Sequence, residues 1–115
     1  MRNLFTAFVC LAALMTSGNL ARADKTERTW QGKCASCHGE DGKGQTTKGK
    51  EMGLKDLSSA AVQKDLTDAQ IQKAIEDGVS ATKDGKKQQM DPYKDKLKPE
   101  QIADLVKYVR SLAGK

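Results

Sequence analysis

The most informative stretch of the chain is Cys34-Ala35-Ser36-Cys37-His38. Two cysteines three residues apart on one helical turn project from the same face, so both thiols can add to the two vinyl groups along one porphyrin edge. C-x-x-C-H is the attachment signature of c-type haem. The stretch therefore predicts one covalent haem c held by Cys34 and Cys37, with His38 as the proximal iron ligand.

Two other interpretations of the cysteine pair are less favoured. A thioredoxin-like redox pair follows a strand in a βαβ unit, and residues 24–115 show no alternating β-branched run. A zinc site needs two further Cys or His ligands, and His38 is the only histidine of the chain. The haem interpretation also explains how a chain with only 4% aromatic residues forms a core, because a porphyrin is a large apolar filler.

The first 23 residues are typical of a secretory signal. Arg2 precedes an uncharged stretch, Leu4–Met15, which is too short to span a bilayer, and Ala21-Arg22-Ala23 offers a small-x-small cleavage pattern. We expect cleavage after Ala23, leaving residues 24–115 as one haem-binding domain in the periplasm. The alternative is an uncleaved anchor. A lipid-modified Cys10 is not expected, because Phe8 and Val9 before it are large.

The rest of the chain predicts an all-α fold. Thr67 and Gln70 form a capping box at the start of one helix, Gly78 follows its end, and Pro99 suits the first position of the last helix. Long polar loops are uncommon in a small domain unless they have a function, such as wrapping a haem. The expected elements are a helix over 25–37, a glycine-rich loop over 39–53, a helical turn over 58–62, a helix over 67–77, a polar loop over 80–98 and a helix from 99 to about 112.

The residue on the other side of the iron decides the chemistry. Without a second histidine, the candidate is a methionine thioether, and residues 24–115 offer Met52 and Met90. Met52 follows His38 closely in the glycine-rich loop, whereas Met90 lies far enough along the chain to reach the opposite haem face. Met90 is the preferred distal ligand. Met52 and an open sixth position remain the alternatives.

The sequence resembles the small bacterial single-haem class I cytochromes c over nearly all of residues 24–115. The similarity is carried by Cys34–Gly44, by the approach Tyr93–Leu97 and by the last helix with Tyr108–Leu112. The resemblance implies three principal helices and two long loops around one haem, Met90 as distal ligand, and Trp30 and Tyr108 locking the terminal helices together.

Three positions depart from the pattern of that family. Asp91 separates Met90 from Pro92, Thr26 stands where a glycine is common, and Lys55 stands where a proline usually precedes Asp-Leu. The sequence does not identify the carbonyl that accepts the Nδ1 proton of His38.

The resemblance implies an electron carrier, not an enzyme, that exchanges single electrons with redox partner proteins. Lysines in both loops are expected to border the haem edge and to attract acidic partners, although an ordinary solvated surface explains them equally well. These lysines are Lys43, Lys48, Lys50, Lys83, Lys86, Lys87, Lys94 and Lys96. The formal charge of +5 and the lack of a basic-aromatic patch do not support nucleic-acid binding. An enzyme or gas sensor with an open site, and a subunit of a larger oxidase or dehydrogenase, remain alternatives; a monomer is expected.

Overall fold

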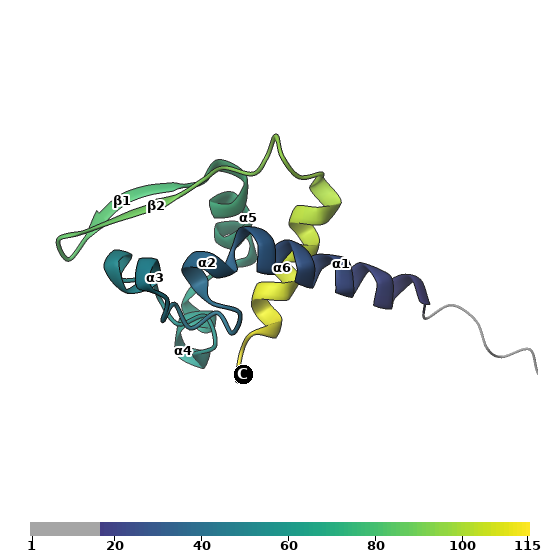
Figure 1. Cartoon of the computed structure of the whole chain (residues 1–115), viewed down its shortest axis with the longest axis horizontal. Coiled ribbons are helices and arrows are strands. Elements are labelled where there is room, and N and C mark those ends of the chain that lie inside the picture. Colours follow the sequence, from purple (N-terminus) through teal and green to yellow (C-terminus); the bar gives the residue numbers. More distant parts are fainter. Residues whose placement is uncertain (1–16) are drawn as a thin grey trace, which may run out of the picture.

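The helices at the two ends of the described chain cross each other near the centre of the folded molecule (Figure 1). The computed structural model describes residues 17–115, with α1 at Ser17–Lys33 and α6 at Pro99–Ser111. Trp30, only 3% exposed, fixes the crossing, because its ring centroid lies 5.4 Å from that of Tyr108. The expected contact between these two aromatic residues is confirmed.

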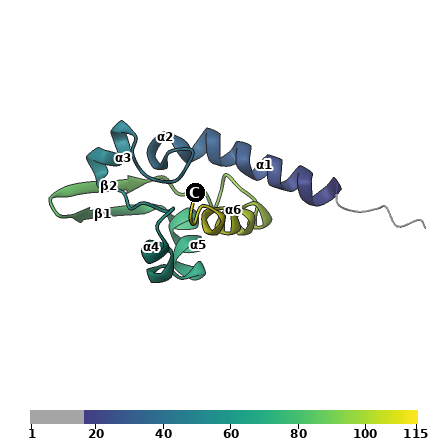
Figure 2. The ribbon, with the colours of Figure 1, turned by 90° about the horizontal axis from the view of Figure 1, so that it is seen from below.

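The remaining elements lie to one side of this crossing (Figures 1 and 2). They are α2 (Ala35–His38), α3 (Thr47–Met52), α4 (Ala60–Asp65), α5 (Asp68–Asp77), β1 (Val79–Lys83) and β2 (Lys86–Met90). The predicted signal stretch Leu4–Met15, with Cys10, falls outside the described residues.

Two helical predictions need correction. The helix expected over 25–37 is interrupted at Cys34, which separates α1 from α2. The stretch 39–53 is not wholly irregular, since it contains α3. The side chain of Thr46 caps this helix by accepting a hydrogen bond from the Gly49 N–H at 2.9 Å, and Gly53 ends it in a left-handed conformation with φ 63°.

Helix α5 forms as the sequence predicts. Thr67 accepts from the backbone N–H of Gln70 at 3.1 Å, and the Gln70 side chain accepts from the Thr67 N–H at 2.9 Å. This capping box satisfies two backbone donors that a helix end otherwise leaves free. The helix ends before Gly78 and buries Ile71 and Ile75 in the shared core with α6.

The prediction of a loop over residues 80–98 is wrong for its first half. Residues 79–90 form an antiparallel hairpin in which Val79 pairs with Met90 and Lys83 with Lys86. Asp84 and Gly85 make the two-residue turn with φ of 52° and 75°, the positive values that a type I′ turn requires. Strand β2 (KKQQM) is rich in Lys and Gln and lacks the apolar alternation that normally signals a strand, and the alternation in β1 (VSATK) is limited to Val79 and Ala81.

A buried polar network joins α6 to the segment before α5. Gln63, 9% exposed, donates to the carbonyl oxygens of Leu57 at 2.6 Å and Val109 at 2.9 Å. Arg110 donates to the Gln63 carbonyl at 2.6 Å and to the Asp68 carboxylate at 2.8 Å. Since buried polar groups are costly without partners, this network fixes how α4, α5 and α6 pack.

Replacing Arg110 should test this network. We expect Arg110→Ala to lower the free energy of unfolding by about 2–3 kcal/mol, because partly buried carbonyls lose a charged donor. Chemical denaturation of the haem-loaded protein measures the change. Lys107→Ala, on an exposed position of the same helix, is the control and should change it by less than about 0.5 kcal/mol. Equal effects of the two variants would show that the network adds nothing to stability.

Candidate haem site

Residues 34–38, which we call the cysteine turn, lie where α1 ends and α2 begins. The Cys34 N–H donates to the Trp30 carbonyl at 2.8 Å, and the His38 N–H donates to the Cys34 carbonyl at 3.0 Å. Both thiols are partly buried, and Cys34 and Cys37 are not joined in a disulfide. One short turn therefore presents two free thiols and an imidazole together, as the sequence predicts.

The environment of Cys34 does not suit a redox-active thiolate. Burial raises the pKa of the Cys34 thiol to about 11, and the nearby Lys33 only partly opposes this effect. Redox-active cysteines have lowered pKa values at electropositive, accessible positions. Within residues 17–115, the only sheet is the antiparallel hairpin, so no βαβ unit surrounds the pair. These features argue against the thioredoxin-like alternative.

His38 is held as a neutral ring. Burial lowers its pKa, because desolvation disfavours the charged imidazolium, and the neutral ring is the form that binds metals. The Trp30 ring lies beside it, 5.6 Å between centroids, and the Trp30 Nε1–H donates to the Gly39 carbonyl at 3.1 Å. The Nδ1 atom of His38 is buried, with no hydrogen-bond partner among the described residues. The loop carbonyl expected to accept the Nδ1 proton is therefore not in place among these residues, and such an unpartnered buried nitrogen is uncommon.

The space beside the cysteine turn has the size and lining of a cofactor pocket. A cleft of about 900 Å³ is lined by Cys34, Cys37 and His38 and also by Met90. A deeper apolar cavity of about 130 Å³ shares Cys34, His38 and Met90 and reaches the core. Pockets for cofactors typically measure about 300–1,000 Å³ and are mostly apolar. The donor set and the cleft therefore fit a haem.

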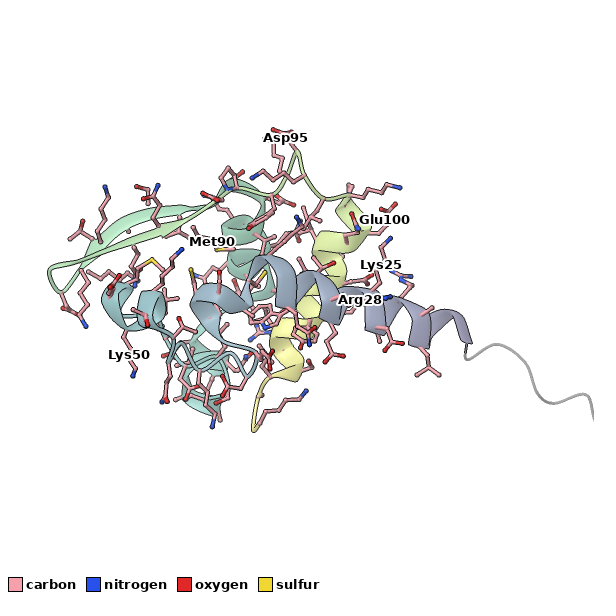
Figure 3. The ribbon with its side chains drawn as sticks, in the orientation of Figure 1. Lys25, Arg28, Lys50, Met90, Asp95 and Glu100 are labelled. Atoms are coloured by element: carbon pink, nitrogen blue, oxygen red, sulfur yellow. The ribbon has the colours of Figure 1, made fainter. Side chains whose placement is uncertain are left out.

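The two candidate methionines occupy different parts of this cleft. Met90, at the base of the hairpin beside α5 (Figure 3), lines both the cleft and the apolar cavity and packs against the core. Met52 lines the outer cleft but not the apolar cavity, and its Sδ accepts a hydrogen bond from the Gln89 N–H at 3.5 Å. Met90 thus shares both the cleft and the apolar cavity with His38, whereas Met52 shares only the cleft.

Close backbone packing sets the position of Met90. A Cβ on Gly78 would lie 2.4 Å from the Met90 carbonyl oxygen, so only glycine allows the chain to pass the end of α5 this closely. The φ of Gly78 is 73°, which also favours glycine. The Tyr93 N–H then donates to the Ile75 carbonyl at 2.9 Å. The insertion of Asp91 before Pro92 is accommodated within this segment.

Several lysines border the cleft, although not all of those expected. Lys48, Lys83, Lys87 and Lys96 line it, whereas Lys43, Lys50, Lys86 and Lys94 do not. Lys33, the last residue of α1, and Lys55 also line it; neither was predicted from the sequence, because both lie outside the loops 39–53 and 80–98. Glu51 and Asp91 are the acidic residues of the lining. The rim of the cleft is therefore mostly basic.

Two further properties concern the whole described chain. Within residues 17–115, no three His, Cys, Asp or Glu side chains are placed to hold a metal ion between them. None of the described helices has the length and apolar character needed to cross a membrane.

Comparisons with known proteins agree with this geometry. The family model described as "Cytochrome c" matches residues 23–113. The solved structure of the "KustC0563 c-type cytochrome" is 30% identical in sequence to this chain and superposes on it with a TM-score of 0.64. The match covers 76% of this chain and 96% of the other. No curated protein matches the chain closely enough to count as a relative. The chain has the predominantly helical cytochrome c fold, and it belongs to the cytochrome c family, in which the haem is covalently bound.

Proposed function

We propose that the protein is a periplasmic electron carrier whose haem is attached to Cys34 and Cys37 and ligated by His38 and Met90. Electron transfer through a haem is what the cytochrome c family suggests. The observation that carries the assignment of the ligands is that Cys34, His38 and Met90, from different elements of the fold, line one apolar cavity.

The residues around the site suit a haem whose iron changes its oxidation state while its ligands stay the same. When bound, the haem supplies one-electron oxidation and reduction of its iron. Burial keeps His38 neutral and able to bind the metal. The Met90 thioether favours the ferrous form, and the apolar lining excludes water, which also favours the less charged state. No acid, base or nucleophile is needed, in keeping with a carrier that performs no bond chemistry.

Exchanging Met90 tests the ligand assignment. We expect the ferric protein to show a sulfur-to-iron charge-transfer band, and the ferrous protein not to bind carbon monoxide. Met90→Ala should abolish the band, allow near-stoichiometric carbon monoxide binding and lower the reduction potential, because the thioether no longer stabilises ferrous iron. Absorption spectra and a redox titration measure these changes.

The parallel variant Met52→Leu distinguishes the two methionines. Loss of the band in Met52→Leu, with its retention in Met90→Ala, would assign Met52 as the ligand. Carbon monoxide binding by the unaltered protein would show an open site and favour an enzyme or a gas sensor over a carrier.

Export to the periplasm and cleavage after Ala23 are also part of the proposal. The exposed ion pair between Arg22 and Asp104, 3.0 Å long, would then be absent from the mature protein. We expect N-terminal sequencing of the periplasmic protein to begin at Asp24, and Ala23→Lys to leave the precursor uncut, because the cleavage site requires a small residue. Recovery of the unaltered protein in membranes with residues 1–23 in place would favour the anchor instead.

The proposed partners are redox proteins that dock at the basic rim of the cleft. If the rim steers them, electron transfer to the anionic reagent ferricyanide should slow as salt is added, because salt screens the attraction. Reversing the charge of Lys48, Lys83 and Lys87 together to Glu should slow it about tenfold at low salt. Lys73→Glu/Lys107→Glu, on α5 and α6 outside the cleft lining, is the control. Equal slowing by both sets would show that the rim is an ordinary solvated surface.

A further inference from the structure

The end of α3 is joined to strand β2 across 36 residues of sequence. The Gln88 Nε2 donates to the Met52 carbonyl at 3.2 Å, and the Lys86 Nζ donates to the Lys50 carbonyl at 3.4 Å. The Lys50 carbonyl also accepts from the Gly53 N–H at 3.2 Å, so β2 adds a second donor there, and Gln88 supplies the side-chain donor to the Met52 carbonyl at the end of α3. Figure 2 shows β2 lying directly beside α3, and Figure 1 agrees.

The other side of α3 is fixed to the cysteine turn. The Thr46 hydroxyl donates to the Cys37 carbonyl at 2.6 Å. A Cβ on Gly49 would lie 2.5 Å from the same Cys37 oxygen and 2.4 Å from the Gly44 oxygen, so α3 packs backbone to backbone on this turn. Helix α3 is therefore a short rigid link between the haem-attachment turn and the strand that carries Met90.

Strand β2 has little else to hold it over the cleft. Within residues 17–115 its only strand partner is β1, and the hairpin extends beyond the body of the molecule (Figure 1). Among its side chains, Lys86, Lys87 and Gln89 are exposed, while Gln88 is partly buried against α3. On the far side of Met90, the backbone is held against α5 at Gly78. The contacts with α3 thus hold the chain before Met90, and the contacts with α5 hold the chain after it.

We infer that Gln88 is a positioning residue that, by tying β2 to the Met52 carbonyl, keeps Met90 over the cleft and closes the sixth iron position. The inference rests on the proposed His38 and Met90 ligation. The Gln89 N–H on Met52 Sδ adds a second, weaker tie at 3.5 Å. Gln88 touches neither the haem-attachment cysteines nor Met90 by any hydrogen bond in the structure; it acts through the strand.

The chain provides a matched pair of variants for the test. Gln88 and its neighbour Gln89 are the same residue type on the same strand, but only Gln88 uses its side chain in the tie. Imidazole is the probe, because it binds ferric iron only after the distal ligand leaves. At saturating imidazole, the rate of loss of the sulfur-to-iron band reports how often Met90 departs.

We expect Gln88→Ala to raise this limiting rate about fivefold, the effect of one net hydrogen bond. Gln89→Ala should stay within about twofold of the unaltered protein, and Gln88→Lys, which retains an N–H donor of similar reach, should restore most of the slow rate. Thermal unfolding of the same holoproteins separates positioning from simple stability: Gln88→Ala should change the rate more than Gln89→Ala even if their melting temperatures are equal.

Two results would overturn the inference, and the sulfur-to-iron band of the unaltered protein distinguishes them. Equal imidazole rates in Gln88→Ala and Gln89→Ala, in a protein whose sulfur-to-iron band is present, would remove the role of Gln88 and leave the proposed ligation intact. Absence of the band in the unaltered protein, with immediate imidazole binding, would overturn the Met90 ligation and the positioning role together.

Discussion

The structure depends on how tightly the turn of residues 34–38 is held from behind. Its backbone carbonyls are occupied by donors from separate segments: the Thr46 hydroxyl binds the Cys37 carbonyl at 2.6 Å, and the Gly44 N–H binds the His38 carbonyl at 2.7 Å. Trp30 adds an indole N–H to the Gly39 carbonyl. With its backbone polar groups satisfied in this conformation, the turn presents its thiols and imidazole to the cleft.

The cleft directly borders the hydrophobic core of the protein. The buried hydrophobic residues form one cluster along α1, α5 and α6, with Leu105 and Leu112 the most completely buried. Cys34 and Met90 pack against the edge of this cluster, so the haem site is continuous with the core. A chain with so few aromatic residues reaches a folded core because the cofactor contributes apolar surface of its own.

Local signals in the sequence predicted the parts of the fold that local chemistry controls. The capping box at Thr67 and Gln70, the glycine after α5 and the proline that begins α6 were all confirmed, because each acts within a few residues. Helix α3 and the hairpin were missed for the opposite reason. Their polar sequences gain stability from each other and from the Cys37 carbonyl, and no periodicity reports such long-range contacts. The Asp84-Gly85 pair was the one local clue to the hairpin. At the site, the C-x-x-C-H spacing predicted the shared position of Cys34, Cys37 and His38, while the place of Met90 depended on the unpredicted hairpin.

The turn at Asp84-Gly85 is a position where insertions would change the length of the hairpin. Nothing lies within 4 Å of a Cβ built on Gly85, so the tip is free of neighbours on that side. Residues inserted symmetrically beside the turn would lengthen both strands outward and leave the pairing of Val79 with Met90 in register. Insertions and deletions at this one point can therefore change how far the hairpin extends from the body of the protein, in steps of one cross-strand pair, while Met90 stays in place.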